Sequence, residues 1–233
     1  MIAIICAMSE ERDAFISLMK DIKIVKIENF NYHGKPFDNK CYKGKLSGKD
    51  VVLVHSGVGK VYAAIVTTLV IKKFKPELVV NVGCAGTLNK NVHINDVVIA
   101  KRVADWDVDV PDWERSMTSD KMSFACDGRF IKLANGIKAN TNIKVGNIVS
   151  GDAFVSKKSQ INEILKYFPM SDCVEMEGAS IANTCYAFGV NVAIVRSISD
   201  DTTKSNNYLT SEFNLKMVCD TAAKICAKII KRY

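Results

Sequence analysis

Short apolar runs alternate with stretches of helical character along the whole chain, and this alternation constrains the fold more than any other feature. Several of the runs are apolar throughout, which is typical of strands in a sheet that is covered on both faces. The expected strands are Ile2–Cys6, Val51–His55, Leu78–Val82, Asp96–Lys101, Lys144–Val149, Cys173–Glu175 and Val192–Ser197. The expected helices are Glu10–Lys20 with Ser9 as its cap, Ala63–Phe74, Phe130–Ala139, Glu177–Phe188 and Ser211–Lys231. This order predicts a layered α/β domain with a largely parallel sheet, in which residues 104–128 are irregular.

Composition limits the class of protein. The chain has 233 residues, of which 48% are hydrophobic, so we expect one domain over residues 1–233 with a sizeable core. The net charge is +7, but the basic residues are scattered, which favours a solvated surface over a nucleic-acid interface. No apolar run approaches the ~20 residues of a membrane span, and the apolar start is interpreted as a buried strand rather than a signal peptide. The eight cysteines include no Cys-x-x-Cys pair, which favours free thiols in the cytoplasm and argues against a metal site.

Glycines and carboxylates gather where the expected strands end. The segments in question are Ser56–Lys60, Gly83–Gly86, Ser150–Phe154, Glu175–Gly178 and Ser199–Asp201. Because ligands of α/β proteins bind at the carboxyl ends of strands, these segments predict one composite pocket for a small molecule.

The glycine-rich segment Gly57-Val58-Gly59-Lys60 invites two phosphate-binding interpretations, and both fail. A P-loop needs glycine where Val54 stands and Ser or Thr where Val61 stands. A dinucleotide fingerprint needs a third glycine, and position 62 is Tyr. A tight strand-to-helix turn and a ligand loop both remain compatible with this segment.

Three acidic positions are candidates for chemistry, each with a plainer alternative. Glu177 accepts hydrogen bonds from a sugar diol if it faces the pocket, or merely complements a helix dipole. Asp200, if shielded from water, has a raised pKa and serves as a proton donor, whereas Ser199-Asp200 is also a common turn or cap. Of Glu10 and Glu11, one is expected in solvent and the other at the pocket as a general base.

Six motifs in a fixed order carry a resemblance to a known family. They are Ala7-Met8-x-Glu10-Glu11, Ser56–Val61, Asn81–Gly86, Val149–Phe154, Val174–Glu177 and Val195-Arg196-x-x-Ser199-Asp200. With them the whole chain resembles the 5′-methylthioadenosine/S-adenosylhomocysteine nucleosidases of the purine nucleoside phosphorylase superfamily. The resemblance implies a three-layer α/β/α domain with a mixed, barrel-like central sheet, and a homodimer. It also implies hydrolysis of the N9–C1′ bond of a 5′-thioadenosine to adenine and a thioribose, without metal or organic cofactor.

The resemblance assigns roles to the matching residues. Glu11 would activate the water, with Arg196 as a further catalytic residue nearby. Asp200 would protonate or hydrogen-bond adenine N7, with Ser199 positioning it. In the remainder of the implied substrate site, Glu177 holds the ribose 2′- and 3′-hydroxyls, Met176 packs on the sugar, Phe154 stacks on adenine and the Val155 backbone contacts its edge. Met8, Val58 and Phe213 line the 5′-alkylthio pocket, and Cys84 and Glu175 are further substrate-binding residues. Cys84 stands where the family commonly has Ser, and a thiol is the weaker donor. A segment near Trp106–Trp113 would close the partner subunit's pocket.

Other functions are weighed against this one. A phosphorolytic nucleoside phosphorylase needs cations for phosphate, but Asn81 stands where some relatives have Arg, and Glu11 would repel the anion. A non-catalytic nucleoside-binding module would not need three carboxylates, and a nicotinamide oxidoreductase lacks its fingerprint. The sequence leaves open the preference among methylthioadenosine, adenosylhomocysteine and 5′-deoxyadenosine, and it assigns no role to residues 28–39.

Overall fold

A computed structural model describes residues 1–38, 40–202 and 212–233, with the side chains of residues 212–214 outside the description. The strands are β1 Ile2–Cys6, β2 Met19–Lys26, β3 Asn31–Tyr32, β4 Lys35–Pro36, β5 Lys40–Leu46, β6 Lys49–His55, β7 Leu78–Thr87, β8 Val97–Asp105, β9 Ser123–Ala125, β10 Ile143–Ser150, β11 Cys173–Glu175 and β12 Asn191–Asp201. The helices are α1 Ser9–Ile16, α2 Lys60–Phe74, α3 Gly128–Ala134, α4 Lys158–Tyr167, α5 Gly178–Ala187 and α6 Glu212–Arg232.

The central sheet is mixed and closes into a barrel at one end. Its strands follow the order β11-β10-β8-β12-β7-β1-β6-β5-β2, and β11 also pairs with β7. The short antiparallel pairing of Val174 with Gly86 and of Cys173 with Thr87 therefore joins β7, β12, β8, β10 and β11 into a ring. This confirms the expected mixed, barrel-like sheet.

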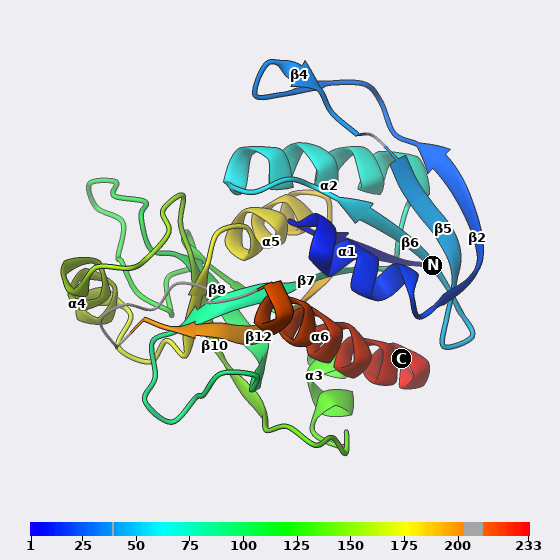
Figure 1. Ribbon diagram of the computed structural model, residues 1–233. Coiled ribbons are helices and arrows are strands. Elements are labelled where there is room, and N and C mark those ends of the chain that lie inside the picture. The colour runs from blue at the N-terminus through cyan, green and yellow to red at the C-terminus, as the bar shows by residue number, and fades with distance from the viewer. Residues whose placement is uncertain (39, 203–211) are drawn as a thin grey trace.

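Helices cover both faces of the sheet (Figure 1). Buried side chains of α2 and α5 pack on one face in one apolar cluster, and those of α1, α3 and α6 pack on the other face in a second cluster. Strand β1 supplies both clusters, because successive side chains of a strand point to opposite faces: Ala3 and Ile5 face one way, Ile2 and Ile4 the other. The three-layer arrangement is thus confirmed.

The first helix is shorter than predicted. It ends at Ile16, and Met19 begins the edge strand β2, which pairs antiparallel with β5. Strand β2 lies at the edge of the sheet, and its exposed charged side chains disfavour pairing with other sheets. Ser9 is the first helical residue rather than the cap, which is Met8.

Strands β7, β8 and β12 run further than predicted, and for β7 and β12 this alters the location of the pocket segments. Strand β7 continues through Gly83–Gly86 to Thr87, and β12 continues through Ser199 and Asp200 to Asp201. Helix α4 was not predicted, although its buried residues Ile161 and Ile164 follow helical spacing, and the stretch expected to be irregular contains β9. In the described part of the chain, no helix is both long and apolar enough to cross a membrane.

Candidate active site

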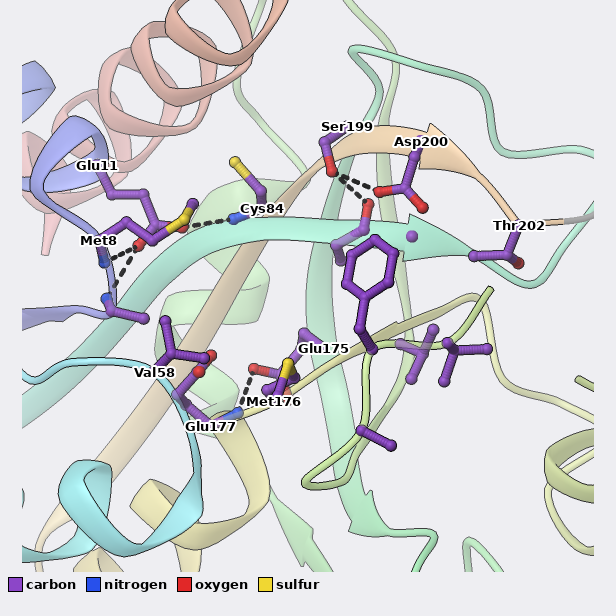
Figure 2. A pocket seen from close by; sticks show the side chains of 17 residues that line it. Met8, Glu11, Val58, Cys84, Glu175, Met176, Glu177, Ser199, Asp200 and Thr202 are labelled. Carbon is purple, nitrogen blue, oxygen red and sulfur yellow. Dashed lines mark hydrogen bonds between the residues drawn. The ribbon is translucent and has the colours of Figure 1, made fainter. Parts of the chain in front are cut away.

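A cavity of about 260 Å³ opens at the barrel end of the sheet (Figure 2). Eleven of the residues named from the sequence line it: Met8, Glu11, Val58, Cys84, Phe154, Val155, Glu175, Met176, Glu177, Ser199 and Asp200. Arg196 does not line the cavity, and the side chain of Phe213 lies outside the described residues. Three candidate acids from distant parts of the chain, Glu11, Glu177 and Asp200, therefore share one cavity.

Glu11 stands in the first turn of α1 and points back into the cavity. Its Oε2 accepts the backbone N–H groups of Ala7 at 2.9 Å and Met8 at 3.0 Å, and its Oε1 accepts that of Cys84 at 3.0 Å. Both carboxylate oxygens are thus fixed by the chain itself. Glu10, the preceding residue, is exposed. One glutamate therefore lies in solvent and the other at the pocket, as expected from the sequence.

The environment of Glu11 balances two opposing effects. Burial raises the pKa of this carboxyl above its ordinary value, although the charge of Arg196 and the three backbone donors act to lower it. A glycine at position 83 makes the placement possible, since a Cβ there would lie 2.5 Å from Glu11 Oε1. The small residues of β7 therefore leave space for the side chain of Glu11.

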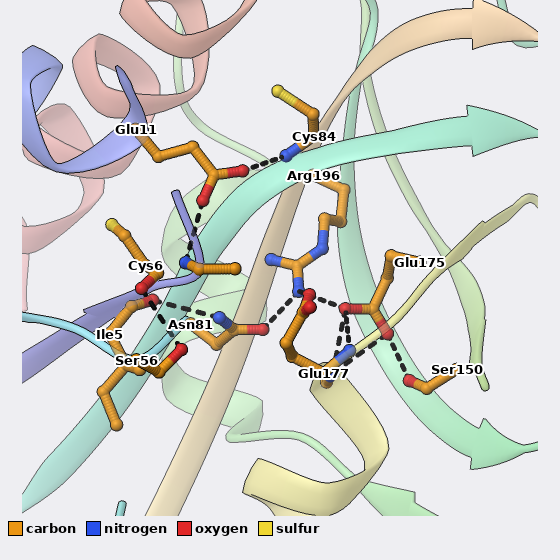
Figure 3. A network of polar contacts seen from close by, with 12 residues as sticks. Ile5, Cys6, Glu11, Ser56, Asn81, Cys84, Ser150, Glu175, Glu177 and Arg196 are labelled. Atoms are coloured by element: carbon orange, nitrogen blue, oxygen red, sulfur yellow. Dashed lines mark hydrogen bonds and ion pairs between the residues drawn. The ribbon is translucent and has the colours of Figure 1, made fainter. Parts of the chain in front are cut away.

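Arg196 lies behind the acids, at the centre of a buried polar network (Figure 3). Its guanidinium donates to the carboxylate of Glu175 and to the side-chain oxygen of Asn81, and it lies 3.9 Å from Glu177 Oε2. Asn81 in turn donates to the carbonyl of Ile5 at 3.0 Å. Arg196 therefore acts on the acids from behind as a fixed positive charge, without reaching the cavity surface.

Glu175 and Glu177 differ in what is left for a ligand. Glu175 accepts the backbone N–H of Glu177 at 3.0 Å and that of Gly178 at 2.8 Å, together with the Ser150 hydroxyl and Arg196. Glu177 accepts the Gly59 N–H at 2.9 Å on Oε1. Burial, followed by the charge of Glu175, raises the pKa of Glu177 to about 8. The carboxylate of Glu175 thus accepts hydrogen bonds from several donors of the protein itself. Glu177 accepts fewer and lines the cavity with acceptor capacity left for a ligand.

Asp200 approaches the cavity from β12. The pairing register with β7 shifts between Ile198 and Asp200, a bulge that re-aims the side chains at this point. The Ser199 hydroxyl donates to Asp200 Oδ1 at 2.7 Å. Burial raises the pKa of Asp200, while the Ser199 hydrogen bond acts to lower it. A Cβ at Gly86 would lie 2.8 Å from Asp200 Oδ2, so this glycine serves Asp200 as Gly83 serves Glu11.

The labelled residues divide the cavity into regions (Figure 2). Met8, Glu11 and Val58 lie toward one end, and Ser199, Asp200 and Thr202 lie toward the other. The segment of Glu175, Met176 and Glu177 lies along the side between them. One acid therefore stands at each end, and a third lies on the wall between.

The wall and its support include residues to which the sequence analysis assigned no role of their own. Six further lining residues are small or short: Ala7, Ala85, Gly86, Ala153, Val174 and Thr202. Asn81 and Ser150 hold the acids from behind. All of these except Thr202 belong to segments or motifs named in the sequence analysis, but they were not assigned individual roles. No local pattern indicates that Asn81 and Ser150 hold the acids from behind.

Cys84 contributes to the site mainly through its backbone. Its N–H holds Glu11, while its Sγ lies 3.7 Å from Sγ of Cys219 in α6. The thiol of Cys84 has a pKa raised well above its ordinary value, first by the contact with Cys219 and then by burial. The hydrogen bond to Glu11 is therefore independent of whether this position carries a thiol or a hydroxyl.

The fold and the site belong to a chain of the phosphorylase superfamily. The model of the family described as Phosphorylase superfamily matches residues 1–231.

Comparison with named relatives identifies the family within this superfamily. A 5′-methylthioadenosine/S-adenosylhomocysteine nucleosidase from an Exiguobacterium species is 36% identical over 99% of this chain and 97% of its own length. The crystal structure of the enzyme of the same name from Neisseria meningitidis, in complex with methylthio-immucillin-A, is 33% identical with a TM-score of 0.86 and covers 100% of this chain and 99% of its own. The chain belongs to the 5′-methylthioadenosine/S-adenosylhomocysteine nucleosidase family. A futalosine hydrolase of Helicobacter pylori is also similar, with 28% identity, a TM-score of 0.81 and coverage of 100% of this chain and 98% of its own.

Proposed function

We propose that the protein hydrolyses the N-glycosidic bond of 5′-methylthioadenosine and S-adenosylhomocysteine, giving adenine and the corresponding thioribose, with 5′-deoxyadenosine as a further candidate substrate. The observation that carries this proposal is the meeting of Glu11, Glu177 and Asp200 around one cavity. Names of the related proteins supply the substrate class.

The proposed reaction divides between the two ends of the cavity. At the base end, Asp200 donates a proton or a strong hydrogen bond to adenine N7, because the adenine anion is a poor leaving group. At the other end, Glu11 orients a water and takes its proton as C1′ acquires oxocarbenium character. An acid on the leaving group and a carboxylate serving water on the opposite face is the inverting arrangement of glycosidases. Each of these groups contributes about 10²–10⁴ in rate.

The remaining roles concern binding. Glu177 accepts hydrogen bonds from the ribose 2′- and 3′-hydroxyls, and Met176 packs on the sugar. Phe154 stacks on adenine while the Val155 backbone contacts its edge, and Met8, Val58 and Phe213 form the 5′-alkylthio pocket. Arg196 is a positioning residue, which fits its contacts with Glu175 and Asn81 behind the cavity.

Replacement of Glu177 with Ala is expected to act on binding. With its pKa at about 8 the carboxyl is largely protonated at neutral pH, and a neutral hydrogen bond contributes about 0.5–1.5 kcal/mol. Loss of the bonds to two ribose hydroxyls should therefore raise KM for 5′-methylthioadenosine by about fivefold to a hundredfold. Initial-rate kinetics over a wide substrate range measure the effect. The exposed Glu163 provides a matched Glu→Ala control. An unchanged KM in the Glu177 variant would remove the sugar-binding assignment.

Phosphate dependence separates hydrolysis from phosphorolysis. We expect full adenine release in phosphate-free buffer, read by chromatography, with free thioribose rather than its 1-phosphate as the second product. Two observations favour water: Asn81 is engaged with Ile5 and Arg196, and Glu11 would repel an anion. Strict dependence on phosphate would establish a phosphorylase, and tight binding without turnover would establish a binding module.

We also infer a homodimer in the cytoplasm. The eight free cysteines support a reducing compartment. Val110 and Trp113, each 36% exposed, offer apolar surface in the segment that the family resemblance places against the partner's cavity.

A further inference from the structure

A charged cluster lies beside the cavity without lining it. Lys60 begins α2, and its Nζ donates to Asp107 Oδ1 at 2.6 Å and to Asp105 Oδ1 at 3.3 Å. The side chains of Lys60, Asp105 and Asp107 are only 18%, 12% and 23% exposed. This degree of burial distinguishes the cluster from ordinary surface ion pairs, whose median contribution is about 0–1 kcal/mol.

Backbone groups extend the cluster to a third segment. The Lys60 N–H donates to Asp152 Oδ1 at 2.8 Å, and the Asp152 N–H donates to Asp107 Oδ2 at 2.7 Å. These residues are here named the Lys60 clasp: Lys60, Asp105, Asp107 and Asp152. The clasp connects the start of α2, the end of β8 with the residues after it, and the segment that follows β10.

Each end of the clasp adjoins a different wall of the cavity. Gly59, which precedes Lys60, donates its N–H to Glu177 Oε1 at 2.9 Å. Its φ of 98° is one that favours glycine, and a Cβ there would lie 3.3 Å from Asp152 Oδ1. On the other side, Asp152 is followed directly by Ala153, Phe154 and Val155, all of which line the cavity.

We propose that Lys60 is a positioning residue, which through the clasp holds the Gly59 donor on Glu177 in register with the wall formed by residues 153–155. This inference rests on the proposed function, because it concerns the relative placement of the sugar-binding acid and the base-binding segment. The charge-assisted bonds of Lys60 are of the strong class. Although burial alone would lower the pKa of Lys60, its bonds with Asp107 and Asp105 keep that pKa above its ordinary value, so the ammonium stays charged.

The expected effect is on KM. The Lys60→Met variant keeps the stem of the side chain and removes its charge, and it should raise KM for 5′-methylthioadenosine by about tenfold. The turnover number should change little, because the clasp makes no contact with Glu11 or Asp200. Lys60→Arg should restore most of the affinity, since a guanidinium can still bond to two carboxylates. Lys45→Met is the matched control: Lys45 pairs with Asp50 at 2.9 Å in an exposed pair.

A double variant tests whether Lys60 acts through Glu177. Coupled residues show non-additive effects, so Lys60→Met should raise KM by less than about threefold in the Glu177→Ala background. A rise there of about tenfold, as in the wild-type background, would overturn the proposal. Equal KM values for Lys60→Met and the wild type would also overturn it.

Backbone hydrogen exchange provides a readout that needs no activity. In the ligand-free protein, Lys60→Met should accelerate exchange of the amides of Gly59, Lys60 and Asp152, while the Lys45 control leaves them unchanged. Unaltered exchange would show that the clasp does not hold these segments, and the inference would fail. If instead the wild-type protein released no adenine, the proposed function would fail, and the exchange result would still decide whether the clasp exists.

Discussion

Asp200→Asn is expected to lower the turnover number for adenine release by about 10²–10⁴. The carboxamide keeps the shape of the side chain and can hydrogen-bond to N7, but it has no acidic proton to transfer. The loss therefore measures proton donation rather than packing. Binding of 5′-methylthioadenosine should persist, so calorimetry should find a Kd close to that of the wild type while chromatography finds little adenine.

The environment of Asp200 explains why it suits this role. Burial raises the pKa of its carboxyl. The protonated fraction of Asp200 near neutral pH is therefore larger than that of an exposed aspartate. A proton donor is lost as pH rises through its pKa. We therefore attribute an alkaline limb of the rate profile to Asp200 and expect that limb to vanish in the residual activity of Asp200→Asn.

The adjacent Asp201 supplies the control for this experiment. It belongs to the same strand but does not line the cavity, so Asp201→Asn should retain most of the activity. Near-normal adenine release from Asp200→Asn would remove Asp200 from the mechanism. Equal losses in the two variants would point to damage of β12 instead.

The acids of the site were accessible to sequence reasoning because each is anomalous in its local context. Glu177 follows a buried strand, Asp200 ends a long apolar run, and Glu11 follows an apolar start. Charged residues are almost never buried without partners, so such positions indicate function. The alternation of strands and helices could also be predicted from the sequence, since it depends on hydrophobic periodicity within short windows.

What the sequence did not reveal depends on pairing between distant segments. Gly83 and Gly86 were expected beyond a strand end, yet they pair within β7, where their missing side chains leave room for Glu11 and Asp200. That space exists only because α1 and β12 approach the same strand. Likewise, Lys60 could not be assigned from its motif, because its aspartate partners lie 45 or more positions away in the chain.

Arg196 shows the same limit for a charged residue. It was expected to be a catalytic residue near Glu11, and no local pattern shows whether such a side chain faces the ligand or stands behind the acids. The structure places it behind them, 1% exposed, between Glu175 and Asn81. Its orientation follows from the barrel closure, which brings β11 beside β7 and so carries Glu175 toward β12.

Glu11→Gln is the second substitution with a large expected effect, again a fall of about 10²–10⁴ in turnover number. Glutamine cannot take a proton from water. It also has one acceptor oxygen where the site presents three backbone donors, those of Ala7, Met8 and Cys84. A general base is lost as pH falls through its pKa, and burial raises the pKa of Glu11. The acid limb of the wild-type rate profile should therefore lie above the usual range of a glutamate and be absent from this variant.

Because Glu11 also anchors the start of α1, a loss of activity alone could reflect a displaced backbone. Glu11→Ala with added formate separates the two causes, since a small carboxylate can enter the space of the deleted side chain and serve as the base. Restoration of adenine release by formate, rising with its concentration, is the result expected of a general base. Failure of formate to restore any activity, with Asp200 and the fold intact, would mean that Glu11 supports the loop rather than the water. Glu10→Gln, at the exposed neighbouring residue, is the control, and its turnover number and pH profile should remain close to those of the wild type.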